Sequence, residues 1–189
     1  MPGVQHMRHT HLPEHKFVSG QPETGADRAD DLERIAMNFG PENIAACIVE
    51  PIAGSTGTLV PPKGYLQKLR DTCDKHGILL IFDEVITGWG RTGSSFASIE
   101  YGVTPDIMTM AKATTNGVVP MGVVACKDEI YDSVMDASPM GSVELFHGYT
   151  YSGIPVAVAA ALAVQDIFEK EDIFNRAKNL APYFQKGLF

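Results

Sequence analysis

The sequence lacks an excess of basic residues: its 189 residues include 23 Asp and Glu against 15 Lys and Arg, for a formal net charge of −8. A protein grips a nucleic-acid backbone mainly through cationic side chains that neutralise phosphates. The acidic balance therefore argues against a nucleic-acid partner.

Long apolar runs are also missing, and none approaches the roughly 18 residues that a membrane-spanning helix needs. The start of the chain, MPGVQHMRHTHLPEH, has no apolar stretch like that of a secretion signal. We therefore expect a soluble, cytoplasmic protein that has no membrane partner.

Cysteine is scarce, and the three cysteines are far apart in the chain: Cys47, Cys73 and Cys126. An odd number of widely spaced cysteines, each within an apolar or helical pattern, fits neither a disulfide framework nor a zinc site. We predict reduced thiols in the core.

Histidine is concentrated near the start of the chain, at His6, His9, His11 and His15. Pro13 interrupts any helix there, and the spacing matches no known metal site. We predict a solvated loop for these histidines and no metal site.

The length and the 44% hydrophobic content allow one sizeable core, so one α/β domain is expected. Residues 1–40 are predicted to form an irregular lead-in and the start of a helix, in ADDLERIAMNFG. Four short apolar runs follow, which are typical of strands buried on both faces. They are Ala45–Val49, Ile78–Phe82, Ile107–Met110 and Met121–Cys126.

Between the first two runs, GYLQKLRDTCDKHG shows helical spacing, and Gly77 stands where a helix C-cap belongs. A strand, a helix and a second strand joined in this way predict parallel strands, and so a mostly parallel sheet with flanking helices. Pro155 suits a first helical turn, so a long helix is predicted from near Ser152. In such sheets the functional groups gather at the carboxyl ends of the strands.

Polar residues follow the predicted strands at that edge: Glu50, the pair Asp83 and Glu84, and Lys112. An acid and an amine would thus face one crevice. From spacing alone, an Asp83–Lys112 salt bridge or helix caps explain these residues about as well as catalysis does.

Five motifs stand in order along the chain: VEPIAGSTG (49–57), FDEVITGWGRTG (82–93), MAKATTNG (110–117), PMG (120–122) and HGYTYSG (147–153). Together they resemble the motifs of class III aminotransferases, which use pyridoxal 5′-phosphate. The resemblance covers about residues 40–189 and is nearest to the omega-amino-acid:pyruvate branch. It implies that the chain is part of the large cofactor-binding domain of a fold-type I enzyme.

The resemblance also implies roles for four residues. Lys112 would bind the cofactor aldehyde as an imine and then move a proton. Asp83 would pair with the pyridine nitrogen, and Val85 would pack against the ring. Thr150 would reach the cofactor phosphate of the neighbouring subunit, which implies a homodimer or a larger assembly; a local helix cap is its alternative role.

At two positions the sequence differs from other branches of the resembled family. Ornithine and 4-aminobutyrate aminotransferases carry a glutamate where this chain has Ser55, and tend to carry a glutamine where it has Ile86. Both differences favour a pyruvate-using transaminase. Arg91 is expected to fix its glycine-rich turn, and GSTG at 54–57 is only a weak phosphate-loop signal because it lacks the Gly-Lys ending.

Members of the family are more than twice as long, so we expect an incomplete chain that is inactive alone. We divide it into the lead-in (1–40), a partial cofactor-binding domain (41–160) and a helix leading toward a missing C-terminal domain (161–189). Two alternatives stay open: another class III chemistry on the same cofactor, such as an aminomutase or a decarboxylating relative, and a non-catalytic fragment.

Overall fold

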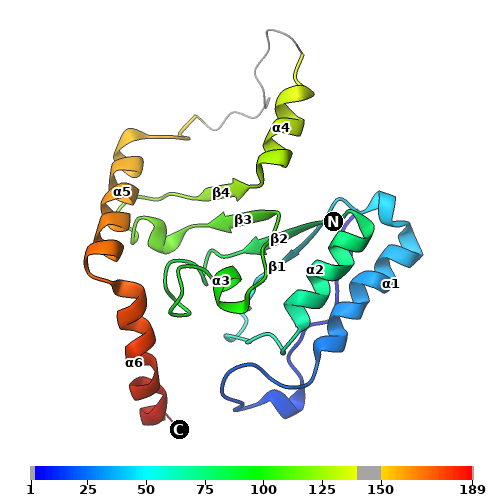
Figure 1. Cartoon of the computed structure of the whole chain (residues 1–189), viewed down its shortest axis with the longest axis horizontal. Helices are drawn as coiled ribbons and strands as arrows, with labels where there is room; N and C mark the ends of the chain where they lie inside the picture. The colour runs from blue at the N-terminus through cyan, green and yellow to red at the C-terminus, as the bar shows by residue number, and fades with distance from the viewer. Residues whose placement is uncertain (1–2, 140–149, 189) are drawn as a thin grey trace.

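The computed structural model of the protein describes residues 3–139 and 150–188 and has a four-stranded sheet at its centre (Figure 1). In spatial order the strands are β1 (Ala46–Val49), β2 (Leu79–Asp83), β3 (Ile107–Met110) and β4 (Val123–Cys126). Strands β1, β2 and β3 are parallel, and β4 is antiparallel to β3. The mostly parallel sheet is thus confirmed, with each strand within two residues of its predicted bounds.

In chain order the helices are η1 (Pro13–His15), η2 (Ala26–Ala29), α1 (Asp30–Phe39), η3 (Pro41–Asn43), α2 (Tyr65–His76), α3 (Ala97–Tyr101), η4 (Lys112–Thr114), α4 (Asp128–Asp136), α5 (Pro155–Lys170) and α6 (Ile173–Leu188). Three of the helices, α1, α2 and α5, lie where the sequence predicted helices, and the others were not predicted as separate helices. Helices α5 and α6 lie on the side toward which β2 and β3 point (Figure 1). The predicted long helix begins at Pro155, three residues after Ser152.

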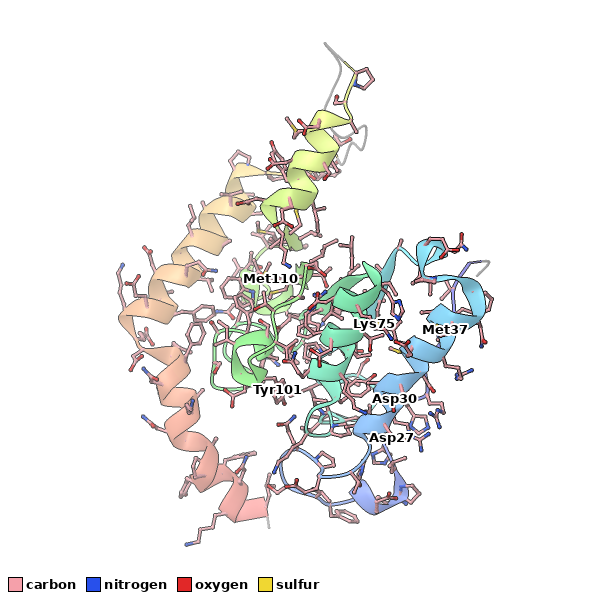
Figure 2. The ribbon with its side chains drawn as sticks, turned by 45° about the vertical axis from the view of Figure 1, so that its right-hand side comes forward. Asp27, Asp30, Met37, Lys75, Tyr101 and Met110 are labelled. Carbon is pink, nitrogen blue, oxygen red and sulfur yellow. The ribbon has the colours of Figure 1, made fainter. Side chains whose placement is uncertain are left out.

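Helix α2 forms where its apolar residues recur on one side. Leu66, Leu69 and Cys73 are buried, and Gly77 ends the helix in the left-handed conformation at φ +66°. On the side facing α1, the Lys75 amine bonds the Glu33 carboxylate at 2.7 Å (Figure 2). The predicted strand–helix–strand unit is confirmed.

One face of the sheet is covered, and the other is largely open. Leu80 and Phe82 in β2 have no exposed surface because α1 and α2 pack over them. By contrast, Ile48 is 61% exposed and Val124 is 69% exposed. The prediction that the strands are buried on both faces is therefore wrong for the residues described, because no helix among them covers these positions.

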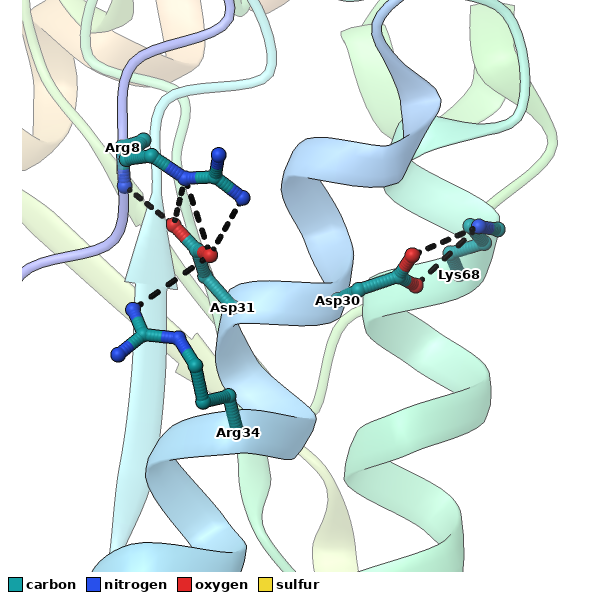
Figure 3. A network of polar contacts seen from close by, with 5 residues as sticks. All are labelled: Arg8, Asp30, Asp31, Arg34 and Lys68. Atoms are coloured by element: carbon teal, nitrogen blue, oxygen red, sulfur yellow. Dashed lines mark hydrogen bonds and ion pairs between the residues drawn. The ribbon is translucent and has the colours of Figure 1, made fainter.

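The irregular lead-in is tied to α1 by a buried carboxylate (Figure 3). Asp31 is 2% exposed and accepts hydrogen bonds from the Arg8 backbone N–H at 2.8 Å and from its guanidinium at 2.7 Å. Arg34 adds a longer ion pair of 3.5 Å. The hydrogen bonds from Arg8 hold the pKa of Asp31 well below its usual range.

His15 is an exception to the predicted solvated loop. It is only 9% exposed; its Nδ1 accepts the Leu12 N–H at 3.3 Å, and its Nε2 lies 3.2 Å from the Thr24 hydroxyl. The prediction is wrong for this residue because the chain turns back over it. The predicted solvated loop agrees with His6 and His9, which are exposed.

The cysteines divide in a way that the sequence did not predict. Cys47 and Cys73 are buried, as expected of core thiols, but Cys126 is exposed because β4 lies at the sheet edge. The prediction of a core thiol is wrong for Cys126. None of the described helices is long and apolar enough to cross a membrane.

Asp106 anchors the amino-terminal end of β3. Its Oδ2 accepts the Leu80 N–H at 2.7 Å and an Arg70 N–H at 2.8 Å, while Oδ1 pairs with Lys127 at 2.7 Å. Burial alone would raise the pKa of Asp106, but these hydrogen bonds outweigh it and lower the pKa. The network connects β2, β3 and β4 at the edge of the sheet opposite to Asp83 and Lys112.

Candidate active site

Asp83 and Lys112 stand at the ends of neighbouring parallel strands. Asp83 is the last residue of β2 and is paired in register with Thr109 of β3. Lys112 follows two residues after β3 ends at Met110. Parallel strands have their carboxyl ends at one edge, so the acid and the amine come to the same side of the sheet.

The Asp83 carboxylate is oriented by two donors. Its Oδ1 accepts the Val85 backbone N–H at 3.0 Å and the Thr109 hydroxyl at 3.1 Å. Its Oδ2 has no hydrogen-bond partner among the described residues, and the side chain is half-buried. One oxygen is thus fixed while the other can accept a further donor.

Lys112 is exposed and begins η4 with a left-handed backbone, φ +45°. This conformation is unfavourable for a residue with a Cβ, by roughly 1–2 kcal/mol. Its amine forms no ion pair with any residue that the structure describes, so the alternative of an Asp83–Lys112 salt bridge is wrong.

Glu84 makes contacts other than those of Asp83. It has no exposed surface, and its carboxylate accepts the Thr87 hydroxyl at 2.8 Å and the backbone N–H groups of Ala97 and Ser98 at 2.8 and 2.7 Å. It therefore caps the start of α3, so the helix-cap alternative applies to Glu84 and not to Asp83. The sequence offered a signal that we missed, because consecutive residues along a strand point to opposite sides.

Glu50 and the GSTG segment form a packing turn. The Glu50 carboxylate accepts the Gly54 N–H at 2.9 Å, and Thr58 N–H donates to the Gly54 carbonyl at 3.0 Å. A Cβ on Gly54 would lie 2.6 Å from Cδ1 of Ile86, so glycine is required for this close approach. The weak phosphate-loop signal therefore has a structural explanation.

Val85 lies beside Asp83, whereas Thr150 does not. Val85 is half-buried in the turn after β2, and its N–H bonds the carboxylate. Thr150 is exposed in the segment before α5, and no hydrogen bond joins it to Asp83, Val85 or Lys112 in the described structure. The preceding motif residues, 147–149, lie outside the described residues.

Arg91 does not fix its turn. It is exposed, and within residues 3–139 and 150–188 it makes no hydrogen bond or ion pair. The turn is closed instead by the Trp89 N–H, which donates to the Ser95 carbonyl at 2.6 Å, and by the Gly93 N–H, which donates to the Gly90 carbonyl at 3.0 Å. The structural prediction for Arg91 is therefore wrong.

The strand-end groups fit a pyridine ring that bears an aldehyde. The Oδ2 atom of Asp83 can accept the N–H of a protonated ring nitrogen, and the exposed amine of Lys112, which has no ion pair within the described residues, can react with a carbonyl. A mostly parallel sheet with these groups at its carboxyl edge defines part of the large domain of a fold-type I pyridoxal-phosphate enzyme.

Comparisons with known proteins agree with this class. The family profile described as Aminotransferase class-III matches residues 2–189. The chain is 56% identical over 187 residues to an omega-aminotransferase of Caulobacter vibrioides, and 51% identical over 187 residues to a beta-alanine–pyruvate aminotransferase of Pseudomonas aeruginosa. Both alignments cover 98% of this chain.

A solved structure agrees as well. A thermostable omega transaminase variant engineered for asymmetric synthesis of bulky amines superposes with a TM-score of 0.90, at 36% identity, over 100% of this chain and 42% of that one. This chain belongs to the class III aminotransferase family, whose members use pyridoxal 5′-phosphate. The predicted resemblance is confirmed. The chain spans 42% of the length of the two curated relatives.

Proposed function

We propose that the complete protein containing this chain is a transaminase that moves an amino group from an omega-amino acid or amine to pyruvate or a similar 2-oxo acid. The observation that carries the proposal is the placement of Asp83 and Lys112 at the carboxyl ends of adjacent parallel strands, with the Asp83 carboxylate already oriented by two donors. The names of the two curated relatives support this choice of substrates.

Lys112 is proposed as nucleophile and proton carrier. Its exposed amine, unpaired within the described part of the chain, is available to attach the cofactor through its aldehyde. When it is free, the same amine would take up the proton from the substrate and return it. The bound cofactor would supply an electron sink for the negative charge that proton removal leaves.

Asp83 is proposed to keep the pyridine nitrogen protonated. The Thr109 hydroxyl and the Val85 N–H hold one carboxylate oxygen, so the other is presented in a fixed direction. Val85 is proposed to pack against the ring face. Neutralising the ring nitrogen would weaken the sink, so this carboxylate sets the rate of proton removal.

Thr150 is proposed to donate its hydroxyl to the cofactor phosphate of a neighbouring subunit, in a homodimer located in the cytoplasm. Its exposure, and the absence of a hydrogen bond to Asp83, Val85 or Lys112 in the described chain, support a role outside its own site. The division into residues 1–40, 41–160 and 161–189 is also a proposal, although α5 runs through residue 160.

The test is made on the complete protein. We expect the wild type with pyridoxal phosphate to show a visible absorption band that borohydride abolishes, and to form alanine from pyruvate and beta-alanine. Lys112→Ala should fold normally but lose both the band and the reaction. Lys170→Ala, which removes an exposed lysine of α5, is the control and should keep both.

A retained band in Lys112→Ala would remove this lysine from the proposal. Product analysis decides the reaction itself: an isomerised or decarboxylated amino acid in place of alanine would replace transamination.

A further inference from the structure

We propose that Trp89 is a positioning residue for Lys112, acting through its hydrogen bond to Thr114; this inference rests on the function proposed above for Lys112. Trp89 is the single tryptophan of the sequence and lies in the loop that follows Asp83. It thereby connects the segment after β2 with the turn after β3.

The connection is a two-step hydrogen-bond chain. The indole N–H of Trp89 donates to the Thr114 hydroxyl oxygen at 3.0 Å, and that hydroxyl donates to the Ala111 carbonyl at 2.9 Å. The Thr114 backbone N–H reaches the same carbonyl at 3.0 Å. Because the Ala111 carbonyl belongs to the peptide that precedes Lys112, this chain fixes the backbone from which the lysine extends.

The turn needs such support because Lys112 has a left-handed backbone, with φ +45°. A lysine is unfavourable in this conformation, which persists only where the surroundings enforce it. Relaxation toward negative φ would change the direction of the side chain. Thr114 is 2% exposed, so its bond to the indole is shielded from competing water.

Trp89 is itself firmly held. The backbone of Trp89 is left-handed at φ +61°, and its backbone N–H donates to the Ser95 carbonyl at 2.6 Å. Its ring lies 5.0 Å from that of Phe96 and 6.0 Å from that of Phe168 in α5, between centroids. The indole ring is therefore held in one position, from which its N–H can donate to Thr114.

Among the described residues, the indole gives the only side-chain hydrogen bond to the Lys112–Thr114 turn from another element. Thr115 closes the other end of the segment by donating to the Val119 carbonyl at 2.6 Å, within the same loop. The contact of α5 with this turn is apolar, through Ala113, Val164 and Phe168. The direction in which the Lys112 side chain extends from the backbone thus depends on Trp89.

The experiment uses the complete protein and two measurements. The first is amide hydrogen exchange of Thr114 and Thr115 in the cofactor-free form. The second is the rate at which the visible band appears when that form is mixed with pyridoxal phosphate. Trp89→Phe keeps an aromatic ring but removes the N–H, and should raise the exchange rates and lower the band rate by about two- to tenfold each.

Two further variants separate positioning from general stability. In a Thr114→Val background, Trp89→Phe should add no further change, because the indole has lost its partner. Phe174→Leu disturbs the same aromatic cluster through Phe168 but leaves the indole bond intact. It should lower the melting temperature while both measurements stay at wild-type values.

Wild-type exchange and band rates in folded Trp89→Phe would overturn the inference, as would an equal effect of Phe174→Leu. If the wild type forms no band at all, the proposed function fails, and the exchange comparison still decides whether Trp89 holds the turn.

Discussion

The Glu84 carboxylate accepts the Ser98 backbone N–H at 2.7 Å, which ties the end of β2 to the start of α3. The neighbouring carboxylate, that of Asp83, accepts hydrogen bonds on the other side, from Thr109 and Val85. Two adjacent acids therefore have different roles: Glu84 caps a helix, and Asp83 is held by donors at the carboxyl edge of the sheet.

Glu84→Gln should destabilise the complete protein by about 2–3 kcal/mol, since the amide group would place a donor against a backbone N–H in a fully buried position. Denaturant unfolding measures the change. Glu100→Gln removes an exposed carboxylate from α3, the helix that Glu84 caps; it is the control and should stay within about 0.5 kcal/mol. Equal losses in both variants would remove the buried cap as the cause.

Asp83→Asn should keep the covalent attachment of the cofactor at Lys112 but slow proton removal by several powers of ten, because an amide cannot hold the ring nitrogen protonated. Single-turnover absorbance with beta-alanine measures the step. Thr109→Val removes one donor to the same carboxylate and should slow the step only about three- to tenfold. A near-normal rate in Asp83→Asn would exclude this carboxylate from the mechanism.

Thr150→Ala should weaken cofactor affinity by about one to two powers of ten, since a hydrogen bond to a charged group contributes about 1.5–3 kcal/mol. In a mixed dimer of Lys112→Ala and Thr150→Ala chains, the site that keeps Lys112 receives an intact Thr150 from its partner. That site should bind cofactor with near wild-type affinity in a titration. Weak binding there would mean that Thr150 acts within its own chain.

Asp31→Asn should lower the free energy of unfolding by about 1–2 kcal/mol at pH 7. This loss is small for a buried carboxylate because its partners Arg8 and Arg34 are exposed to solvent. The folded pKa of Asp31 lies below the unfolded value of about 3.9, so its contribution is complete above that value and is lost as the pH falls toward the folded pKa. Denaturant unfolding of both proteins from pH 7 to pH 3 should therefore show the difference shrinking at the acid end.

The adjacent Asp30→Asn is a matched control. Asp30 is exposed and pairs with Lys68 at 3.2 Å (Figure 3), so its loss should change stability by less than about 1 kcal/mol. A difference between wild type and Asp31→Asn that stays constant down to pH 3 would contradict the ion-pair explanation.

Much of the fold was predictable because local pattern and tertiary structure agree. The apolar run Ile107–Met110 became β3 without change, and the helix before Gly77 ends where a left-handed cap was expected. The burial of both faces was mispredicted because an apolar strand such as β1 does not reveal which of its faces the described chain covers, and Ile48 is exposed.

The candidate site was predictable only in part. Spacing placed Asp83 and Lys112 at one sheet edge, because the carboxyl ends of parallel strands meet there. The alternation of side chains along a strand indicates that Asp83 and Glu84 face opposite sides, but it does not reveal which of the two is buried against α3. Spacing also could not predict that Arg91 has no hydrogen-bond or ion-pair partner among the described residues, because an exposed side chain finds partners only where the fold provides them.

The sequence by itself determined the family and the order of the four strands, and it indicated candidate residues for the chemistry, because these follow from the order of side chains along the chain. Only the tertiary structure decided that Thr109 orients Asp83 and that Trp89 reaches Thr114 across 25 positions of sequence. Such hydrogen bonds depend on distances of about 3 Å between segments that meet only after the sheet has formed, and no local pattern encodes them.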